Sequence, residues 1–250
     1  MNAALEAEGL VKRYGARTAV QDLSFSVPRG SIYGVLGPNG AGKSSTLRML
    51  VGVLRPTAGR ISVLGGAADR ETMKRVGYLP EERGLYRGMS ARSAIAYLAR
   101  LKGTPANKAF KRADALLNDH GLGKVKRKRI KTLSKGMAQK VQVLGAIAHE
   151  PDLIIFDEPF SGLDPVNQRV LEDTIRAQAA AGRTILFSTH VMEHAERLCD
   201  RILLIARGKA AFEGTVRDAL ALAPSLAVIE TDGDYDISPV LAPLGFQWSE

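Results

Sequence analysis

A glycine-rich loop directly after a short apolar run constrains this chain more than any other feature. The run is Ile32-Tyr33-Gly34-Val35-Leu36, and the loop is Gly37-Pro38-Asn39-Gly40-Ala41-Gly42-Lys43-Ser44. Glycines let the backbone turn its N–H groups toward one point, as a loop that cradles a triphosphate requires. Residues 45–50 predict a helix whose positive N-terminal end faces the same anion. A strand, a phosphate-binding loop and a helix are therefore expected in this order.

The residues at the end of the loop have separate roles in holding a triphosphate. Lys43 is expected to reach the β and γ phosphates, and the Ser44 hydroxyl is placed to bind Mg²⁺. The nucleotide contacts predicted from this segment are Gly37, Pro38, Asn39, Gly40, Ala41, Gly42, Lys43, Ser44 and Ser45. A triphosphate and Mg²⁺ are therefore the expected ligands.

A second polar cluster follows the apolar run Leu153-Ile154-Ile155-Phe156, which is typical of a strand buried on both faces of a parallel sheet. Asp157 and Glu158 come directly after it, at the carboxyl edge where such sheets bind ligands. Asp157 suits the Mg²⁺ shell as the acidic partner of Ser44. Glu158 is predicted to be the general base that polarises an attacking water.

A histidine follows the next apolar run, Thr184-Ile185-Leu186-Phe187. His190 ends the sequence Ser188-Thr189-His190 and is expected at the same sheet edge. There it would donate to the γ-phosphate or orient the attacking water, so we assign it with Lys43 and Glu158 to catalysis.

The apolar patterns predict an α/β chain around this site. Alternating residues from Leu5 to Val27 indicate antiparallel strands, and 60–64 returns as a strand. Helices are expected at 90–101, 107–120, 135–149 and 166–181. The fold class is a P-loop NTPase core with a mainly parallel sheet, an N-terminal antiparallel β subdomain and an inserted α-helical subdomain at about 84–133. The core domain is expected to span 1–214. An appendage of unknown role, 215–250, would hold a short helix near 216–222 and a strand at 226–230.

Composition indicates where the chain is located but does not identify its binding partner. No apolar stretch approaches the roughly 20 residues of a membrane span, and the N-terminus lacks a secretory pattern, so a cytosolic chain is expected. The net charge of +9 favours nucleic acid, anionic lipid or an acidic protein surface. Part of this charge is the basic run 124–131, for which a solvated segment and a docking surface both stay open. Cys199 is the single cysteine and is expected to fill core space.

Further motifs resemble those of the ATP-binding cassette ATPases over about Leu5 to Gly214. Leu133-Ser134-Lys135-Gly136-Met137 is similar to the family's signature, Ser161-Gly162-Leu163-Asp164 to its D-loop, and His190 to its switch histidine. Tyr14 stands where the family stacks an aromatic ring on adenine. The resemblance implies that two subunits pair head to tail, so that Ser134 and Gly136 of one chain contact the ATP held by the phosphate loop of the other.

The resemblance also implies a function. The leading hypothesis is a peripheral ATPase at the cytoplasmic face of the membrane that powers a separate permease, and the segment 78–86 most resembles bacterial export-type subunits. The permease's cytoplasmic helices would dock near residues 84–101, and no direct contact with nucleic acid is expected. The alternative is a soluble ATPase of the same family that acts on nucleic acid or regulates a membrane complex.

The sequence departs from the family pattern at two places. Lys135 and Met137 replace the usual glycine and glutamine of the signature. Glu81 stands where most members have a glutamine that reaches Mg²⁺, and we count it among the metal ligands with Ser44 and Asp157. A carboxylate there would repel the γ-phosphate whenever Mg²⁺ is absent.

We therefore predict that Glu81→Gln makes ATP hydrolysis less strictly dependent on Mg²⁺. The measurement is the ATPase rate across a Mg²⁺ titration. An unchanged titration curve would contradict the role given to Glu81.

Overall fold

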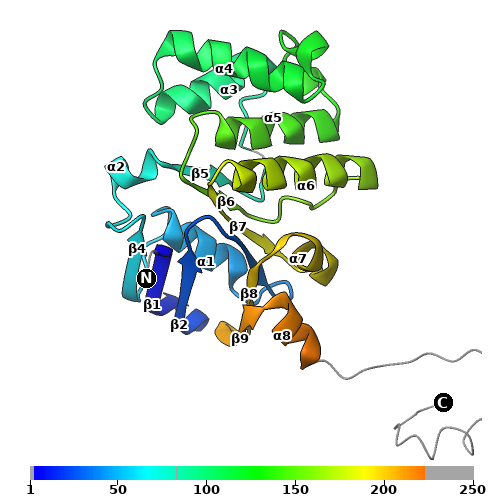
Figure 1. Cartoon of the computed structure of the whole chain (residues 1–250). Helices are drawn as coiled ribbons and strands as arrows, with labels where there is room; N and C mark the ends of the chain where they lie inside the picture. Colours follow the sequence, from blue (N-terminus) through cyan, green and yellow to red (C-terminus); the bar gives the residue numbers. More distant parts are fainter. Residues whose placement is uncertain (1–2, 83, 223–250) are drawn as a thin grey trace, which may run out of the picture.

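A computed structural model describes residues 3–82 and 84–222 of the chain. In these residues two β-sheets lie at one end of the molecule, and a layer of helices forms the other end (Figure 1). The helices and strands match the expected fold class, with an antiparallel N-terminal sheet beside a mainly parallel one.

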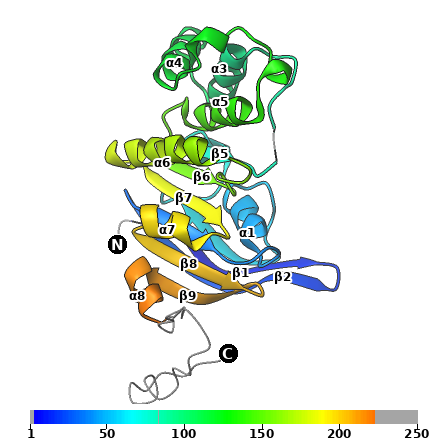
Figure 2. The same ribbon diagram turned by 90° about the vertical axis from the view of Figure 1, so that its right-hand side faces the viewer.

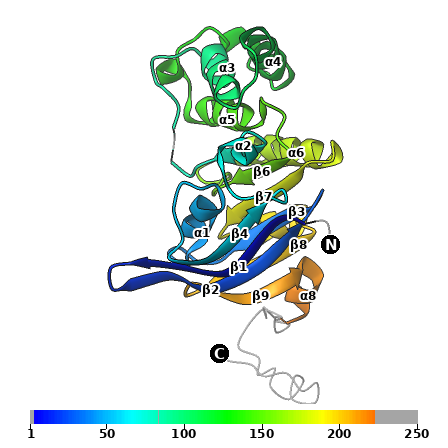
Figure 3. The same cartoon turned by 90° about the vertical axis from the view of Figure 1, so that its left-hand side faces the viewer.

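The smaller sheet contains β1 (Ala3–Tyr14), β2 (Arg17–Pro28) and β4 (Ala58–Val63) in the order β2-β1-β4. Both pairs are antiparallel, which confirms the predicted strands and places the segment near residue 60 beside β1. Buried and exposed residues alternate along much of β2 because only one face of this sheet is covered by the core. Figure 3 shows the long β1–β2 hairpin extending past α1 (Lys43–Leu50).

The larger sheet holds six strands in the order β5-β6-β7-β3-β8-β9. Their bounds are β3 (Ile32–Leu36), β5 (Val76–Leu79), β6 (Leu153–Phe156), β7 (Thr184–Thr189), β8 (Arg201–Ala206) and β9 (Lys209–Thr215). Every pair is parallel except β8 with β9. The sequence analysis did not identify α2 (Arg70–Met73), α7 (Met192–Leu198), β5, β8 or β9.

Successive residues of β6 enter two different cores. Ile154 and Phe156 pack with the helical layer and with α6 (Pro165–Ala180). Leu153 and Ile155 point to the opposite face, into a core shared with α1 and the antiparallel sheet. All four side chains are fully buried, which explains why the sequence of this strand is a continuous apolar run.

The helical layer contains α3 (Ala91–Leu101), α4 (Ala106–Asp119) and α5 (Lys135–Ile147), with 3₁₀ turns at Gly123–Val125 and Ile130–Thr132. The four predicted long helices are confirmed, each within about two residues. In Figure 2, α5 lies between the α3–α4 pair and the rest of the molecule. The layer therefore continues past residue 133, because buried residues of α5 share a core with α3 and α4.

The last two helices of the described residues are α7 (Met192–Leu198) and α8 (Val216–Ala221). The helix predicted near 216–222 is confirmed, whereas the strand predicted at 226–230 lies outside the described residues. Cys199 packs against apolar side chains of two core clusters, as expected, and burial raises the pKa of its thiol. Across residues 3–82 and 84–222, no helix combines the length and apolar character needed to cross a membrane.

The sheet and the helical layer approach each other closely at Gly77 of β5. A methyl group on this residue would collide with the carbonyl oxygen of Ala146 and lie 3.1 Å from Cγ of Pro151. We predict that Gly77→Ala lowers the free energy of unfolding by about 1–3 kcal/mol, as overpacking does elsewhere. Urea denaturation measures this. Gly88→Ala is the control because a methyl group there would meet no atom within 4 Å, and equal stability of both variants would contradict the prediction.

Candidate nucleotide-binding site

Three glycines give the phosphate loop its shape. Gly37, Gly40 and Gly42 have φ angles of 153°, 78° and 110°, which side chains rarely adopt. A Cβ atom at Gly37 would collide with the carbonyl oxygen of Ile205, and one at Gly42 would lie 2.6 Å from the carbonyl oxygen of Ala19. Gly42 also caps α1 without a side-chain hydrogen bond. The N-cap residue therefore supplies no side-chain acceptor to the first N–H groups of α1, which suits a bound anion at this end of the helix.

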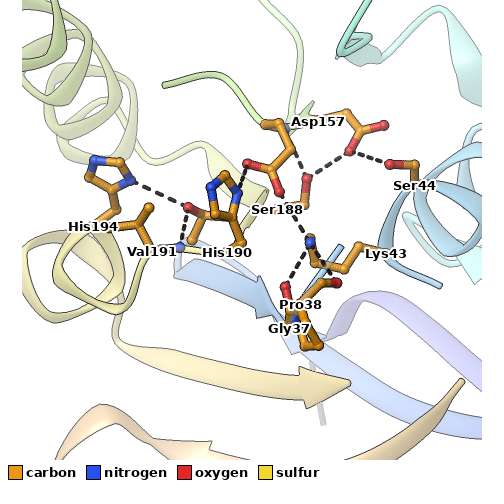
Figure 4. A network of polar contacts seen from close by, with 11 residues as sticks. Gly37, Pro38, Lys43, Ser44, Asp157, Ser188, His190, Val191 and His194 are labelled. Atoms are coloured by element: carbon orange, nitrogen blue, oxygen red, sulfur yellow. Dashed lines mark hydrogen bonds and ion pairs between the residues drawn. The ribbon is translucent and has the colours of Figure 1, made fainter. Parts of the chain in front are cut away.

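Lys43 lies inside the loop with 5% of its side chain exposed. Its Nζ donates to the carbonyl oxygens of Gly37 at 2.7 Å and Pro38 at 3.3 Å (Figure 4). The same atom forms an ion pair with Oε1 of Glu158 at 3.2 Å. The ammonium group is thus held at the centre of the loop, where a bound phosphate would exchange with these oxygens.

Asp157 connects β6 to the neighbouring elements of the site. Its Oδ1 accepts from Ser44 Oγ at 3.2 Å and from Ser188 Oγ at 2.7 Å (Figure 4). Burial raises the pKa of Asp157, the two hydrogen bonds partly offset this, and the nearby charge of Glu81 raises the pKa further. The other oxygen, Oδ2, is buried without a hydrogen-bond partner.

This arrangement fits a magnesium ion held mainly by a nucleotide. Among the residues that the structure describes, no three His, Cys, Asp or Glu side chains cluster as a complete metal site. Mg²⁺ on a nucleotide needs only one or two protein groups, because phosphates and waters supply the other ligands. Ser44 and the unpartnered oxygen of Asp157 meet that requirement, and Glu81 lies near enough to act on Asp157 electrostatically.

Glu158 is held in a strained backbone conformation between two side chains. Its φ angle is 48°, in the left-handed region that costs a non-glycine residue of order 1–3 kcal/mol. Its N–H donates to Ser188 Oγ at 2.9 Å, and its carboxylate lies 3.2 Å from Lys43 Nζ and 3.0 Å from His190 Nδ1. His190 is 46% exposed, whereas Glu158 is 9% exposed. The surrounding contacts therefore fix the carboxylate and leave the imidazole open to solvent.

A cavity of about 410 Å³ opens over the phosphate loop. Its lining residues are Tyr14, Arg17, Ala19, Asn39, Gly40, Gly42, Lys43, Ser44, Ser45, Glu81 and Glu158. Tyr14 is 47% exposed, and its hydroxyl lies 3.4 Å from Ser45 Oγ. The sequence analysis missed Arg17, which begins β2 three residues after Tyr14. Its position in a hairpin directly after the expected adenine contact was the available signal.

The two predicted signature contacts lie elsewhere. Ser134 caps α5 by accepting from the N–H of Met137 at 3.3 Å, and neither Ser134 nor Gly136 lines the cavity over the phosphate loop. A Cβ atom at Gly136 would lie 2.9 Å from Nδ2 of Asn167, so this glycine allows α5 to approach α6 closely. Within one chain, the structure brings together the phosphate loop, Asp157, Glu158 and His190, but not the signature residues.

Comparisons with known proteins point to one family. A family model described as ABC transporter matches residues 20–161. The ABC transporter ATP-binding protein YhaQ of Bacillus subtilis (strain 168) is 41% identical over 214 residues, which cover 86% of this chain and 72% of that protein. Nod factor export ATP-binding protein I of Ralstonia nicotianae (strain ATCC BAA-1114 / GMI1000) is 39% identical over 246 residues, which cover 96% of this chain and 76% of that protein. A solved ATP-binding subunit of an ABC transporter has a TM-score of 0.79 and 34% identity, over 86% of this chain and 91% of that one.

The buried carboxylate of Asp157 yields a prediction about stability. Because folding raises the pKa of Asp157, the folded state binds the proton more tightly, and stability falls as pH rises through that pKa. We predict that Asp157→Asn raises the melting temperature of the ligand-free protein at pH 7 by about 2–4 °C, the shift that about 1 kcal/mol gives at this size. The gain should shrink as pH falls toward the ordinary carboxyl pKa.

Thermal unfolding at several pH values measures this effect. Asp152→Asn is the matched control, because Asp152 is half-exposed and pairs with Arg75 at the surface. A melting temperature for Asp157→Asn at or below that of the control would show that burial of Asp157 costs no stability.

Proposed function

The chain belongs to the ATP-binding cassette (ABC) transporter family, and we propose that it is the peripheral ATPase of an export complex, in which it hydrolyses Mg²⁺-ATP to drive a separate membrane permease. Binding and hydrolysis of ATP are the characteristic activities of this family, so the chain is an ATP-binding and ATP-hydrolysing subunit. The observation that carries the assignment is the meeting of Lys43, Asp157, Glu158 and His190 beside one loop. Export is supported by the Nod factor export relative.

The cavity residues suggest how the nucleotide is held. The backbone N–H groups of the loop from Asn39 to Ser45 would surround the phosphates, and Lys43 would supply the cation. Tyr14 presents its ring to the adenine at the open side of the cavity. Ser44, Asp157 and Glu81 would hold the Mg²⁺ ion, which would neutralise charge on the phosphate oxygens.

Hydrolysis requires a water to attack the γ-phosphorus as the bond to the β–γ bridging oxygen breaks. Glu158 takes the proton from this water, and ADP leaves with the bridging oxygen. His190 holds the carboxylate from one side through its Nδ1, and its exposed ring is free to contact the γ-phosphate. The ion pair of Lys43 with Glu158 is replaced in part when phosphate arrives, which frees the carboxylate to face the water.

A second subunit completes each ATP site in this proposal. Ser134 and Gly136 lie at the N-terminus of the 13-residue helix α5, which is a suitable anion site, yet they do not line the cavity of their own chain. Head-to-tail pairing would bring them to the γ-phosphate held by the partner. Bound ATP would then join the two chains, and hydrolysis would release them.

The helical layer offers the docking place for the permease. A cavity of about 400 Å³ lies between the segment that leads into α3 and the start of α5. Its lining residues are Leu85, Arg87, Ile130, Lys131, Leu133, Lys135, Ala138 and Gln142. We place the permease's cytoplasmic helices here, which puts the subunit at the cytoplasmic face of the membrane. We retain residues 1–214 as the nucleotide-binding domain and 215–250 as an appendage, and we extend the helical subdomain predicted at about 84–133 to include α5, which shares its core.

We predict that Glu158→Gln lowers kcat for ATP hydrolysis by about 10²- to 10⁴-fold, the usual contribution of a general base. ATP binding should persist, because the phosphate loop and Lys43 are unchanged, and ATP should trap a dimer. Steady-state ATPase assays, nucleotide titration and size-exclusion chromatography with ATP measure the three effects. Glu196→Gln, an exposed change of the same type in α7, is the control. Undiminished turnover would exclude Glu158 as the base, and lost ATP binding would exclude a role limited to chemistry.

A further inference from the structure

The positive charge of this chain is concentrated in its helical layer. Residues 84–133 contain thirteen of the 35 Lys and Arg residues but only two of the 26 Asp and Glu residues, a net charge of +11. Because the whole chain carries +9, the other 200 residues together carry −2. The charge therefore marks one end of the molecule, the end occupied by α3 and α4 in Figure 1.

The densest part of this charge is a loop whose backbone is fixed. Residues 124–131 connect α4 to α5, and their backbone is hydrogen-bonded to the segment 87–92. Four bonds join the two segments: Ala91 N to Lys128 O at 3.1 Å, Arg92 N to Lys126 O at 2.9 Å, Ile130 N to Met89 O at 2.8 Å, and Lys131 N to Arg87 O at 3.1 Å. The buried side chain of Ile130 anchors the loop in the core. The loop therefore presents its charged side chains from a rigid base, which reduces the entropy lost on binding.

Of the six basic side chains of this segment, Lys131 lines the cavity at the start of α5, and the other five divide into paired and unpaired groups. Lys126 and Arg92 share Asp114, with distances of 3.4 Å and 2.9 Å to its Oδ1. Lys124, Arg127, Lys128 and Arg129 are exposed, and within residues 3–82 and 84–222 none of them forms an ion pair. We call these four residues the basic platform. Their charges are available to an external anion.

We propose that the basic platform binds the anionic headgroups of the membrane surface, so that the subunit holds lipid as well as permease. A basic side chain close to an anionic bilayer raises partitioning about fivefold, and four such side chains raise it several hundredfold. The platform adjoins the cavity in which Arg87, Ile130 and Lys131 are lining residues. This inference rests on the proposed function in one respect: a permease docked in that cavity brings the bilayer to this end of the molecule.

An exposed aromatic side chain beside the platform favours a bilayer over other polyanions. Tyr86 is 57% exposed and packs edge to face on Tyr97, with ring centroids 5.5 Å apart. It directly precedes Arg87, whose carbonyl is bonded to Lys131 at the end of the basic run. Tyrosine rings are favoured at the headgroup level of membranes, because the ring is apolar and the hydroxyl is polar. A charged platform with an adjacent tyrosine suits this boundary.

The test is co-sedimentation of the purified full chain with phosphatidylcholine vesicles that contain or lack 30% phosphatidylglycerol, at about 50 mM and 500 mM salt. The platform variant carries Lys124→Gln, Arg127→Gln, Lys128→Gln and Arg129→Gln. The control variant carries four exposed changes outside the helical layer, Arg55→Gln, Arg60→Gln, Arg70→Gln and Lys209→Gln, and so has the same net charge. A double-stranded DNA and an RNA of mixed sequence are titrated in parallel.

The expected result is binding to the anionic vesicles only, weakened at high salt, about 100-fold or more weaker in the platform variant and nearly unchanged in the control. An equal loss of vesicle binding in both variants would show that only net charge matters and would overturn the proposal. Tighter binding of DNA or RNA than of vesicles, lost in the platform variant, would replace it with a nucleic-acid surface.

Two further measurements keep this test separate from folding and from ATP hydrolysis. The double variants Lys124→Gln/Arg127→Gln and Lys128→Gln/Arg129→Gln should each lose about 10- to 30-fold in vesicle binding, so the result does not depend on one heavily altered chain. ATP hydrolysis without vesicles should be equal in wild-type and platform variants. Hydrolysis with no vesicle binding would overturn the lipid inference alone, whereas a wild-type chain without hydrolysis would overturn the proposed function.

Discussion

The parallel pairing of β3, β6 and β7 determines where the phosphate loop, the acidic pair and His190 lie. Parallel strands end at the same edge of a sheet, and these three are direct neighbours. The phosphate loop follows β3, the acidic pair follows β6, and His190 follows β7. Residues separated by more than 100 positions are thereby brought within hydrogen-bond distance, as Ser44 and Asp157 are. A shift in this pairing would separate the cation, the carboxylates and the imidazole together.

The same edge of the sheet holds buried carboxylates whose charge is unfavourable without a cation. Asp157 is buried with one oxygen unpartnered, and Glu158 combines a left-handed backbone with a nearly buried carboxylate. The rest of the fold holds these groups in place: Ser188 bonds to both residues, and Lys43 neutralises part of the negative charge. Such a site is poised for a ligand that brings its own cation, because Mg²⁺ on ATP would satisfy the carboxylates and the phosphates would satisfy the ammonium group.

The sequence was most informative where backbone geometry restricts the residue type. Gly37 and Gly42 leave no room for a side chain, so the loop had to appear as a glycine motif, and the buried β6 had to appear as an apolar run ending in two acids. The sequence was less informative where a residue's position depends on contacts with segments far away in the chain. The place of Arg17 in the cavity depends on the β1–β2 hairpin lying near the loop, and α5 joins the helical layer through side chains that a helical pattern alone does not assign to a partner. Nor does any local pattern reveal the left-handed conformation of Glu158.

One strand links the two halves of the molecule mechanically. The four side chains of β6 alternate between the core beneath the helices and the core above the antiparallel sheet, and the strand ends at Phe156, one residue before the acidic pair. Close-packed cores transmit displacement rather than absorb it. In the proposed complex, a force that another protein applies to the helices would therefore be transmitted through β6 to the proposed general base, and the free energy of ATP hydrolysis would do mechanical work along the same path.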